Sequence, residues 1–215
     1  MINGPATADR SGISVSDAGD VNGDGLADLL IGANLASPHG TRSGTAHLVF
    51  GKATTTKVEV SDIEAGTGGF AIHGAALRDQ AGYSVSGIGD INGDGMADVI
   101  VGARFDDPRG SYSGASFVVF GKATTTTVEL SDVDTGTGGF VINGVSANDR
   151  SGFAVSGAGD VNGDGTPDVI IGAIYDSPNA SRAGASFVVF GKANTTTVEL
   201  SDVEAGTGGF VINGV

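Results

Sequence analysis

The sequence predicts an all-β protein made of three copies of one structural unit. A short motif rich in Asp, Asn and Gly recurs at a constant spacing, beginning at Asp20, Asp90 and Asp160. Short apolar segments rich in β-branched residues, typical of strands, surround each copy. No segment combines a helical apolar period with capping signals, so no helix longer than one turn is expected. Four short antiparallel strands at a fixed period are typical of a β-propeller blade, and the chain should hold three four-stranded blades.

The repeat divides the chain into three predicted blades. Their ranges are 1–71, 72–141 and 142–215, and the last range includes the start of a fourth repeat from Ile212 onward. The tripeptide Ile2-Asn-Gly4 matches Ile142-Asn-Gly144, so both ends lie within the repeated pattern. We therefore expect a piece of a longer array. Since one blade cannot cover its own apolar faces, neighbouring blades should supply the core.

The second unit illustrates the expected strands. Residues 83–86 alternate large apolar with small polar side chains, which fits a strand with one covered face. Residues 99–101 form an apolar strand directly after the motif. A turn region containing Pro108 leads to a third strand at residues 115–120, and residues 140–143 form the last strand.

Two smaller features recur in each unit. A short apolar stretch, residues 128–130 in the second unit, lies between the third and last strands. A Gly-Ala dipeptide ends the second strand, with its glycine at Gly32, Gly102 and Gly172. Because glycine has no Cβ, adjacent blades should approach closely there.

The repeated motif carries side-chain oxygen atoms at its positions 1, 3, 5 and 9. Its first copy reads Asp20-Val-Asn-Gly-Asp-Gly-Leu-Ala-Asp28. Three carboxylates and one amide oxygen suit a hard cation, usually Ca²⁺, and a main-chain carbonyl at position 7 would complete the shell. The glycines allow the sharp turn that lets alternate side chains converge. The predicted ligands of three Ca²⁺ ions are Asp20, Asn22, Asp24, Leu26, Asp28, Asp90, Asn92, Asp94, Met96, Asp98, Asp160, Asn162, Asp164, Thr166 and Asp168.

Three other interpretations of the motif are less satisfactory. Asp, Asn and Gly form ordinary turns, but a plain turn does not explain the same oxygen pattern three times at one spacing. An EF-hand requires Glu at position 12 between two helices, whereas Ile31, Val101 and Ile171 stand there inside apolar segments. A calcium β-roll needs consecutive nonapeptides, and each motif here stands alone in its unit.

Composition excludes several functional classes. The net charge is −14, and nine of the 25 acidic residues lie in the three motifs. This acidity, without a basic stripe, argues against nucleic acid and anionic membranes as partners. No apolar run is long enough for membrane insertion. Cysteine is absent, so disulfides do not join the units.

The third unit resembles an FG-GAP repeat, the blade of the integrin α-chain propeller and of related bacterial surface proteins. The resemblance rests on residues 151–160, the motif that follows, and residues 169–173 and 184–190, and it extends over nearly the whole chain. It implies that the Asp, Asn, Asp and Asp side chains of each motif bind Ca²⁺ at the edge of the ring. The family's Phe-Gly and its proline after Gly-Ala are altered here, to Ser11-Gly12, Ala81-Gly82 and Ser151-Gly152, and to Asn34, Arg104 and Ile174. These changes spare the metal ligands but weaken the expectation of an integrin-like partner.

The sequence does not predict an enzyme. An active site would combine acid, base or nucleophile groups, and none of the three histidines (His39, His47 and His73) recurs at the matching position of another unit. His47 is replaced by Phe117 in the second unit, which indicates packing in a strand. His73 is replaced by Asn143, which indicates a turn.

The predicted function is a calcium-binding propeller module for cell-surface adhesion or protein–protein interaction, with structural Ca²⁺. A glycan-binding propeller and a passive spacer in a large repeat protein remain alternatives. Extracellular calcium modules bind at about 10⁻⁴–10⁻³ M, so we expect an extracellular or cell-surface location. Three blades cannot close a ring, and a homodimer would complete one of six blades. The protein or glycan ligand is not identified by the sequence.

Overall fold

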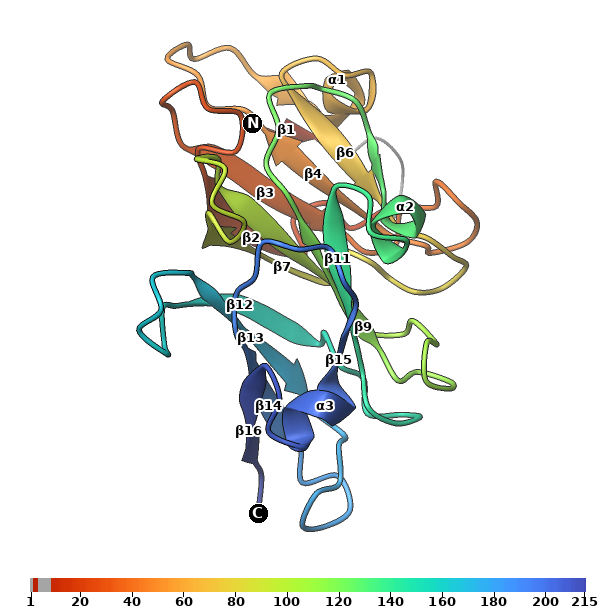
Figure 1. Ribbon diagram of the computed structural model, residues 1–215. Coiled ribbons are helices and arrows are strands. Elements are labelled where there is room, and N and C mark those ends of the chain that lie inside the picture. Colours follow the sequence, from red (N-terminus) through yellow and green to blue (C-terminus); the bar gives the residue numbers. More distant parts are fainter. Residues whose placement is uncertain (1, 4–8) are drawn as a thin grey trace.

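The computed structural model describes residues 2–3 and 9–215 of the chain (Figure 1). Residues 1 and 4–8, part of the first predicted blade, lie outside the described residues. Three sheets follow one another along the molecule, from the red N-terminal part to the blue C-terminal part (Figure 1). The predicted all-β class and the three propeller blades are confirmed. No helix in the described ranges is long and apolar enough to span a membrane.

Each blade contains four antiparallel strands joined in chain order. The first blade comprises β2 (Ser14–Gly19), β3 (Asp28–Ala33), β4 (Thr45–Val49) and β6 (Gly69–His73). The second comprises β7 (Ser84–Gly89), β8 (Asp98–Ala103), β9 (Ala115–Val119) and β11 (Gly139–Asn143). The third comprises β12 (Ala154–Gly159), β13 (Asp168–Ala173), β14 (Ala185–Val189) and β16 (Gly209–Asn213). All four strands expected in the second unit are therefore present.

Two sheets gain a fifth strand from the following unit. The additional short strands are β1 (Ile2–Asn3), β5 (Val58–Glu59), β10 (Val128–Glu129) and β15 (Val198–Glu199). Strand β10 pairs in parallel with β6, and β15 pairs in the same way with β11, while β1 pairs with β5. The repeat boundaries placed after residues 71 and 141 fall inside β6 and β11, so sequence units and sheets are offset.

A five-residue helix follows each of the strands β5, β10 and β15. The helices are α1 (Val60–Glu64), α2 (Leu130–Asp134) and α3 (Leu200–Glu204), slightly longer than the single turn expected. In α2, Leu130 and Val133 are buried, whereas the N-terminal Glu129 makes no side-chain capping hydrogen bond. Burial of one face therefore stabilises these helices, which explains why the sequence shows no capping signal for them.

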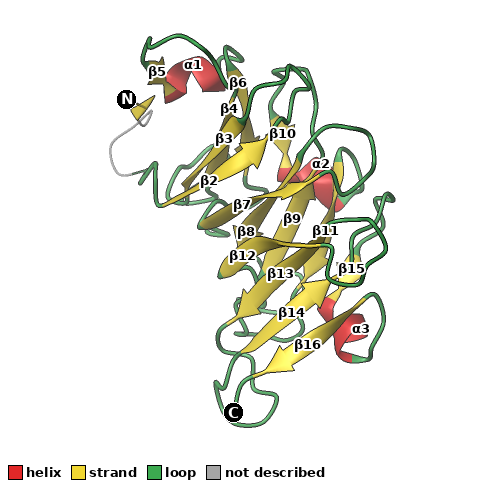
Figure 2. Ribbon diagram, turned by 90° about the vertical axis from the view of Figure 1, so that its left-hand side faces the viewer, coloured by secondary structure: helices red, strands yellow, loops and turns green. Residues whose placement is uncertain are grey.

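Adjacent blades pack through their first strands. Strands β2, β7 and β12 lie next to one another (Figure 2). The backbone N–H of Val85 donates to Ser14 Oγ at 3.1 Å, and that of Val155 donates to Ser84 Oγ at 3.0 Å. The buried core is continuous from one blade to the next. Phe70 of the first blade and Val101 of the second blade belong to the same cluster of buried residues. Neighbouring blades therefore supply the core, as predicted.

The backbones of adjacent blades lie in close contact at the Gly-Ala dipeptides. A Cβ added at Gly102 would lie 2.2 Å from the carbonyl oxygen of Gly152 in the third blade. At Gly32 it would lie 2.0 Å from the carbonyl oxygen of Gly82. The predicted close approach is thus confirmed at both junctions between blades.

One partly buried carboxyl group, that of Asp106, lies in the segment between β8 and β9. Burial, together with the negative charges of Asp79, Asp134 and Asp107, raises the pKa of Asp106 to about 7, although the Asp107 N–H donates to it. The equivalent residue of the first unit is Ala36, which is buried. The position therefore accepts a small apolar side chain.

Replacing Asp106 by alanine is expected to stabilise the protein in a pH-dependent way. Because the pKa is higher in the folded state than in the unfolded state, ionised Asp106 destabilises the fold above about pH 7, and this cost disappears as the pH falls toward about 4. The variant should be more stable by about 1–3 kcal/mol near pH 8 and nearly equal to the parent near pH 4. Urea unfolding at both pH values measures the difference. A difference independent of pH would contradict the buried-charge explanation.

Candidate metal-binding loops

The three predicted metal loops connect the first and second strands of the blades. In the first loop, Asp20 accepts hydrogen bonds from the N–H groups of Gly23 and Gly25, both at 2.8 Å, and from that of Asp24 at 3.0 Å. Asp90 makes the corresponding bonds to Gly93, Gly95 and Asp94 at 2.7, 2.8 and 3.0 Å. Asp160 makes them to Gly163, Gly165 and Asp164 at 2.7, 2.9 and 3.1 Å. The three loops therefore share one conformation.

The two glycines of the loop adopt left-handed backbone conformations. Gly23 has φ +75° and Gly25 has φ +87°, a region in which other residues are strained. The equivalent glycines of the other two loops have the same sign of φ. The glycines thus provide the sharp turn that the sequence predicted.

The side chains at positions 3 and 5 face the same short stretch of backbone. Asn22 Oδ1 accepts from the Asp24 N–H at 2.8 Å, and Asp24 Oδ1 accepts from the Leu26 N–H at 2.9 Å. Asn22 Nδ2 also donates to Asp24 Oδ2 at 3.0 Å. Met96 and Thr166, the other position-7 residues, likewise donate their N–H to the aspartate two residues before them.

The last aspartate of each loop is buried at the start of the second strand. Asp28 is 0% exposed and accepts from the N–H groups of Val21 at 2.9 Å and Gly51 at 2.7 Å. Asp98 makes the equivalent bonds to Ile91 and Gly121. Burial raises the pKa of Asp98 to about 7 in spite of these bonds, and the charges of Asp94 and Asp90 act in the same direction.

A bound cation would offset the repulsion among the loop carboxylates and would favour the ionised form of the buried aspartate. The donor set is therefore suited to a hard divalent ion, because every side chain at positions 1, 3, 5 and 9 offers an oxygen. The carboxylates are, however, more widely spaced than in a closed shell. In the described part of the chain, only His39, His73 and Glu129 form a group of at least three His, Cys, Asp or Glu residues whose ligand atoms all lie within 4.8 Å of one another. Calcium binding would draw the loop carboxylates closer together.

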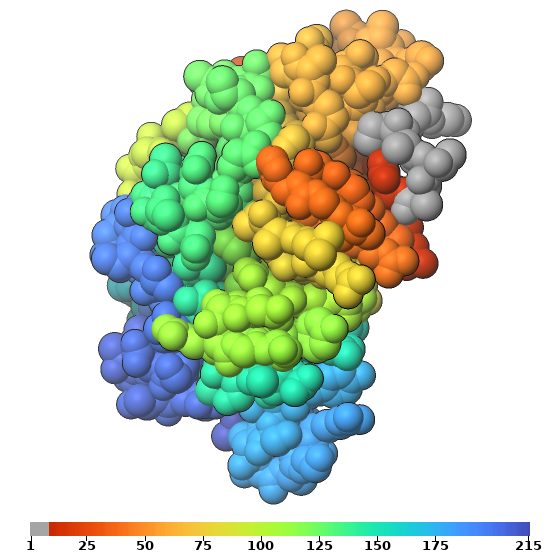
Figure 3. Space-filling model, turned by 90° about the vertical axis from the view of Figure 1, so that its right-hand side faces the viewer, coloured from red at the N-terminus to blue at the C-terminus, as the bar shows by residue number. Residues whose placement is uncertain are grey.

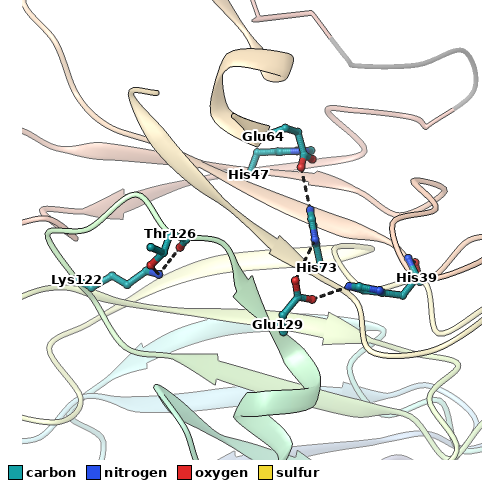
Figure 4. Close-up of polar contacts among 8 residues, drawn as sticks. His39, His47, Glu64, His73, Lys122, Thr126 and Glu129 are labelled. Atoms are coloured by element: carbon teal, nitrogen blue, oxygen red, sulfur yellow. Dashed lines mark hydrogen bonds and ion pairs between the residues drawn. The ribbon is translucent and has the colours of Figure 1, made fainter. Parts of the chain in front are cut away.

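The histidines form a cluster that the sequence did not predict (Figure 4). His47 Nε2 and His73 Nε2 donate to the two carboxylate oxygens of Glu64, at 2.7 and 2.9 Å. These hydrogen bonds lower the pKa of Glu64 to about 2. His39 Nε2 lies 2.7 Å from Glu129 Oε2. All three histidines of the chain are thus joined to two glutamates.

His47 and His73 both lie in strands of the first sheet. His47 is a fully buried residue of β4, which confirms the predicted packing in a strand. The turn predicted at His73 is wrong, because His73 is the last residue of β6 and is the register partner of Glu129 in β10. Burial disfavours the charged form of His73, but hydrogen bonds and attraction from Glu64 and Glu129 outweigh it and raise the pKa of His73.

A cavity of about 290 Å³ lies at the end of the blades opposite the metal loops. It is lined by Arg42, Arg78, Gln80, Phe105, Tyr112 and Arg150. These residues belong to the segments after β3, β6, β8 and β11, and Figure 3 shows the orange, yellow and lime segments side by side on this face. Three arginines in one cavity contrast with the net charge of −14 and suit an anionic ligand. The cavity could not be predicted from the sequence because its residues come from three units.

Comparison with known proteins identifies related repeats. The family model described as the FG-GAP repeat matches residues 13–49, 81–119 and 151–189, which cover the first three strands and the predicted metal loop of each blade. The chain is similar to integrin alpha-7 of Mus musculus, 29% identical over 165 residues, and to integrin alpha-PS2 of Drosophila melanogaster, 29% identical over 178 residues. These alignments cover 76% and 80% of this chain, and 12% of each relative. Integrin alpha-5 of Xenopus laevis is 33% identical over 174 residues, 80% of this chain and 15% of the relative. The chain thus spans a small part of the proteins that it matches.

Proposed function

Because this chain belongs to the FG-GAP repeat family, we propose that it is a calcium-binding propeller module for adhesion or protein–protein interaction. The main support is the metal loop, which occurs three times with the same hydrogen bonds and the same oxygen side chains. Its relatives are integrin alpha chains, and the resemblance supports a binding function and not a catalytic one.

Each loop would hold one Ca²⁺ through the side chains at positions 1, 3, 5 and 9 and the main-chain carbonyl at position 7. In the first loop these residues are Asp20, Asn22, Asp24, Asp28 and Leu26. A bound ion supplies positive charge between the end of β2 and the start of β3. The loop itself contributes the turn and the buried anchor Asp28, so the proposed role of Ca²⁺ is structural. Typical affinities of about 10⁻⁴–10⁻³ M for extracellular modules support a location outside the cell.

The partner of this module is proposed to bind at the cavity lined by three arginines. Its positive charge favours an anionic group such as an acidic side chain of a protein partner. The same cavity supports the second candidate, a glycan-binding propeller, because Phe105 and Tyr112 line it and an acidic sugar would match both features.

Pairing of two chains into a six-blade ring is proposed from the outer face of the third blade. Phe70 and Phe140 are fully buried, whereas the equivalent Phe210 is 39% exposed. Ile212 is likewise exposed while Ile72 and Ile142 are buried. A further blade placed against β16, from a second copy of the chain, would cover these side chains.

Replacing Asp94 by alanine tests the calcium proposal at one site. The variant should bind two Ca²⁺ ions where the parent binds three, because Asp94 is the exposed position-5 ligand of the second loop. It should lose about 1 kcal/mol of stability in millimolar calcium and little in chelator. Calorimetric titration and thermal unfolding give the two readouts.

Asp132, an exposed aspartate in the first turn of α2, provides a matched control outside the loops. Its replacement by alanine should leave the number of bound ions unchanged. Equal stability losses for Asp94→Ala in calcium and in chelator would show that Asp94 stabilises the turn without binding metal.

A further inference from the structure

We propose that His39, His73 and Glu129 form a zinc-class metal site at the junction between the first and second blades. One ligand atom from each of the three residues lies within 4.8 Å of the other two. His39 belongs to the segment between β3 and β4, His73 to β6, and Glu129 to β10 of the next unit. A metal ion bound there would join two blades (Figure 4).

Both histidines lie within reach of the Glu129 carboxylate. His39 Nε2 lies 2.7 Å from Glu129 Oε2, and His73 Nδ1 lies 3.5 Å from Glu129 Oε1. Zinc–ligand bonds of about 2.0–2.2 Å place tetrahedral ligands about 3.3 Å apart. The two contacts, which end on different oxygens of Glu129, lie on either side of this value, and one ligand atom of each residue lies within 4.8 Å of the others. Small side-chain rotations would therefore admit the ion.

A second glutamate fixes the orientation of the partly buried histidine ligand, His73. His73 Nε2 donates to Glu64 Oε2 at 2.9 Å, which leaves Nδ1 as the atom that faces Glu129. When the His73 ring is neutral with its proton on Nε2, the lone pair of Nδ1 faces the Glu129 carboxylate. These two electron-rich groups repel each other, and a cation between them would attract both. A carboxylate that holds the other nitrogen of a ligating histidine is also the usual support of zinc sites.

The second blade junction offers an internal comparison. The positions equivalent to His39, His73 and Glu129 are occupied by Arg109, Asn143 and Glu199. There Arg109 Nε donates to Glu199 Oε2 at 2.8 Å, and Asn143 Nδ2 donates to Glu199 Oε1 at 3.1 Å. The arginine supplies the positive charge that Glu199 requires. At the first junction two imidazoles take the places of the arginine and the asparagine, so the same scaffold gains metal ligands and loses its permanent cation.

The ligand types and their exposure identify the class of metal. Two imidazoles and one carboxylate favour Zn²⁺ and similar transition metals, whereas Ca²⁺ prefers oxygen ligands alone. The side chains of His39, Glu129 and His73 are 45%, 33% and 16% exposed, so the ion can enter from solvent and retain a water ligand. The site is thus chemically distinct from the three loops.

Zinc titration of the whole chain in millimolar calcium tests the proposal, because calcium saturates the oxygen loops. The parent should bind one Zn²⁺, and Co²⁺ in its place should give the visible absorption of a tetrahedral site. His39→Arg and His73→Asn each introduce the residue found at the second junction, so the fold should be retained. Each should weaken zinc binding by roughly 100-fold.

Two further variants complete the test. Arg109→His combined with Asn143→His should create a second site and raise the number of bound zinc ions from one to two. His47→Phe, which introduces the residue of the second unit at a buried position outside the ligand set, should weaken binding by less than about 10-fold. Unchanged zinc affinity in both His39→Arg and His73→Asn would overturn the proposal, as would zinc binding that excess calcium abolishes.

Discussion

Replacing Gly102 by alanine is expected to destabilise the protein by about 3 kcal/mol or more. The added Cβ would lie 2.2 Å from the carbonyl oxygen of Gly152 and 3.1 Å from its carbonyl carbon. Both are backbone atoms, so no side-chain rotation relieves the overlap. The φ of Gly102 lies outside the left-handed region, so alanine causes no backbone strain there. The loss of stability would therefore come only from the added Cβ forcing the second and third blades apart.

Gly172 is the matched control, since it is the equivalent residue of the third blade. A Cβ there would meet its nearest neighbour, Ala154 Cβ, at 3.6 Å, which is an ordinary contact. Gly172→Ala should therefore change the free energy of unfolding by less than about 1 kcal/mol. Denaturant unfolding of both variants makes the comparison. Similar losses in the two variants would show that the glycine is needed within its own strand and not for blade contact.

Removal of calcium from the parent protein is expected to cost about 4 kcal/mol in total, if each of three loops binds about tenfold below the calcium concentration used. For a chain of this size the loss corresponds to a fall in Tm of roughly 10 °C. The physical reason is that carboxylates such as Asp90, Asp94 and Asp98 repel one another when no ion separates them, and burial already raises the pKa of Asp98.

Thermal unfolding in calcium, in chelator, and in chelator followed by excess calcium measures this effect. The His39→Arg variant should be examined in parallel, because a chelator would also remove zinc from the proposed junction site. Magnesium should restore little stability, since it requires short octahedral bonds and retains its water. An identical Tm with and without calcium would contradict the assignment of the loops as calcium sites.

The local features of the fold could be predicted from the sequence because they depend on neighbouring residues. The strands of the second blade follow from apolar segments such as Ala115–Val119, and the loop conformation follows from its glycines. The close approach at Gly32 and Gly102 was predictable because both glycines end a buried strand. The regular spacing then extended each local prediction to all three units.

The features that were missed depend on contacts between units. Strand β10 has two residues, too few to show any periodicity, and its pairing with β6 crosses the repeat boundary. That pairing places Glu129 beside His73, so the histidine cluster could not be found from one unit. His39 and His73 do not recur in other units, which argued against a role for them. This lack of recurrence reflects a difference between the two blade junctions, because Arg109 and Asn143 take their places at the second junction.

The offset between sequence unit and sheet has a consequence for how such an array can change its length in evolution. Deletion of one full repeat length restores the repeat pattern, whichever residue the deletion begins at. Loss of residues 50–119, for example, would join Val49 to Phe120 and recreate the dipeptide Val119-Phe120. Strand β11 would then take the place of β6 and would still pair with β15, so the first sheet would keep a fifth strand and the four-stranded last sheet would be unchanged. Recombination could therefore add or remove one repeat length in a single step and leave the strand pairing between units intact. The chemistry of the junction would change, however, because His39 would then face Asn143 and Glu199.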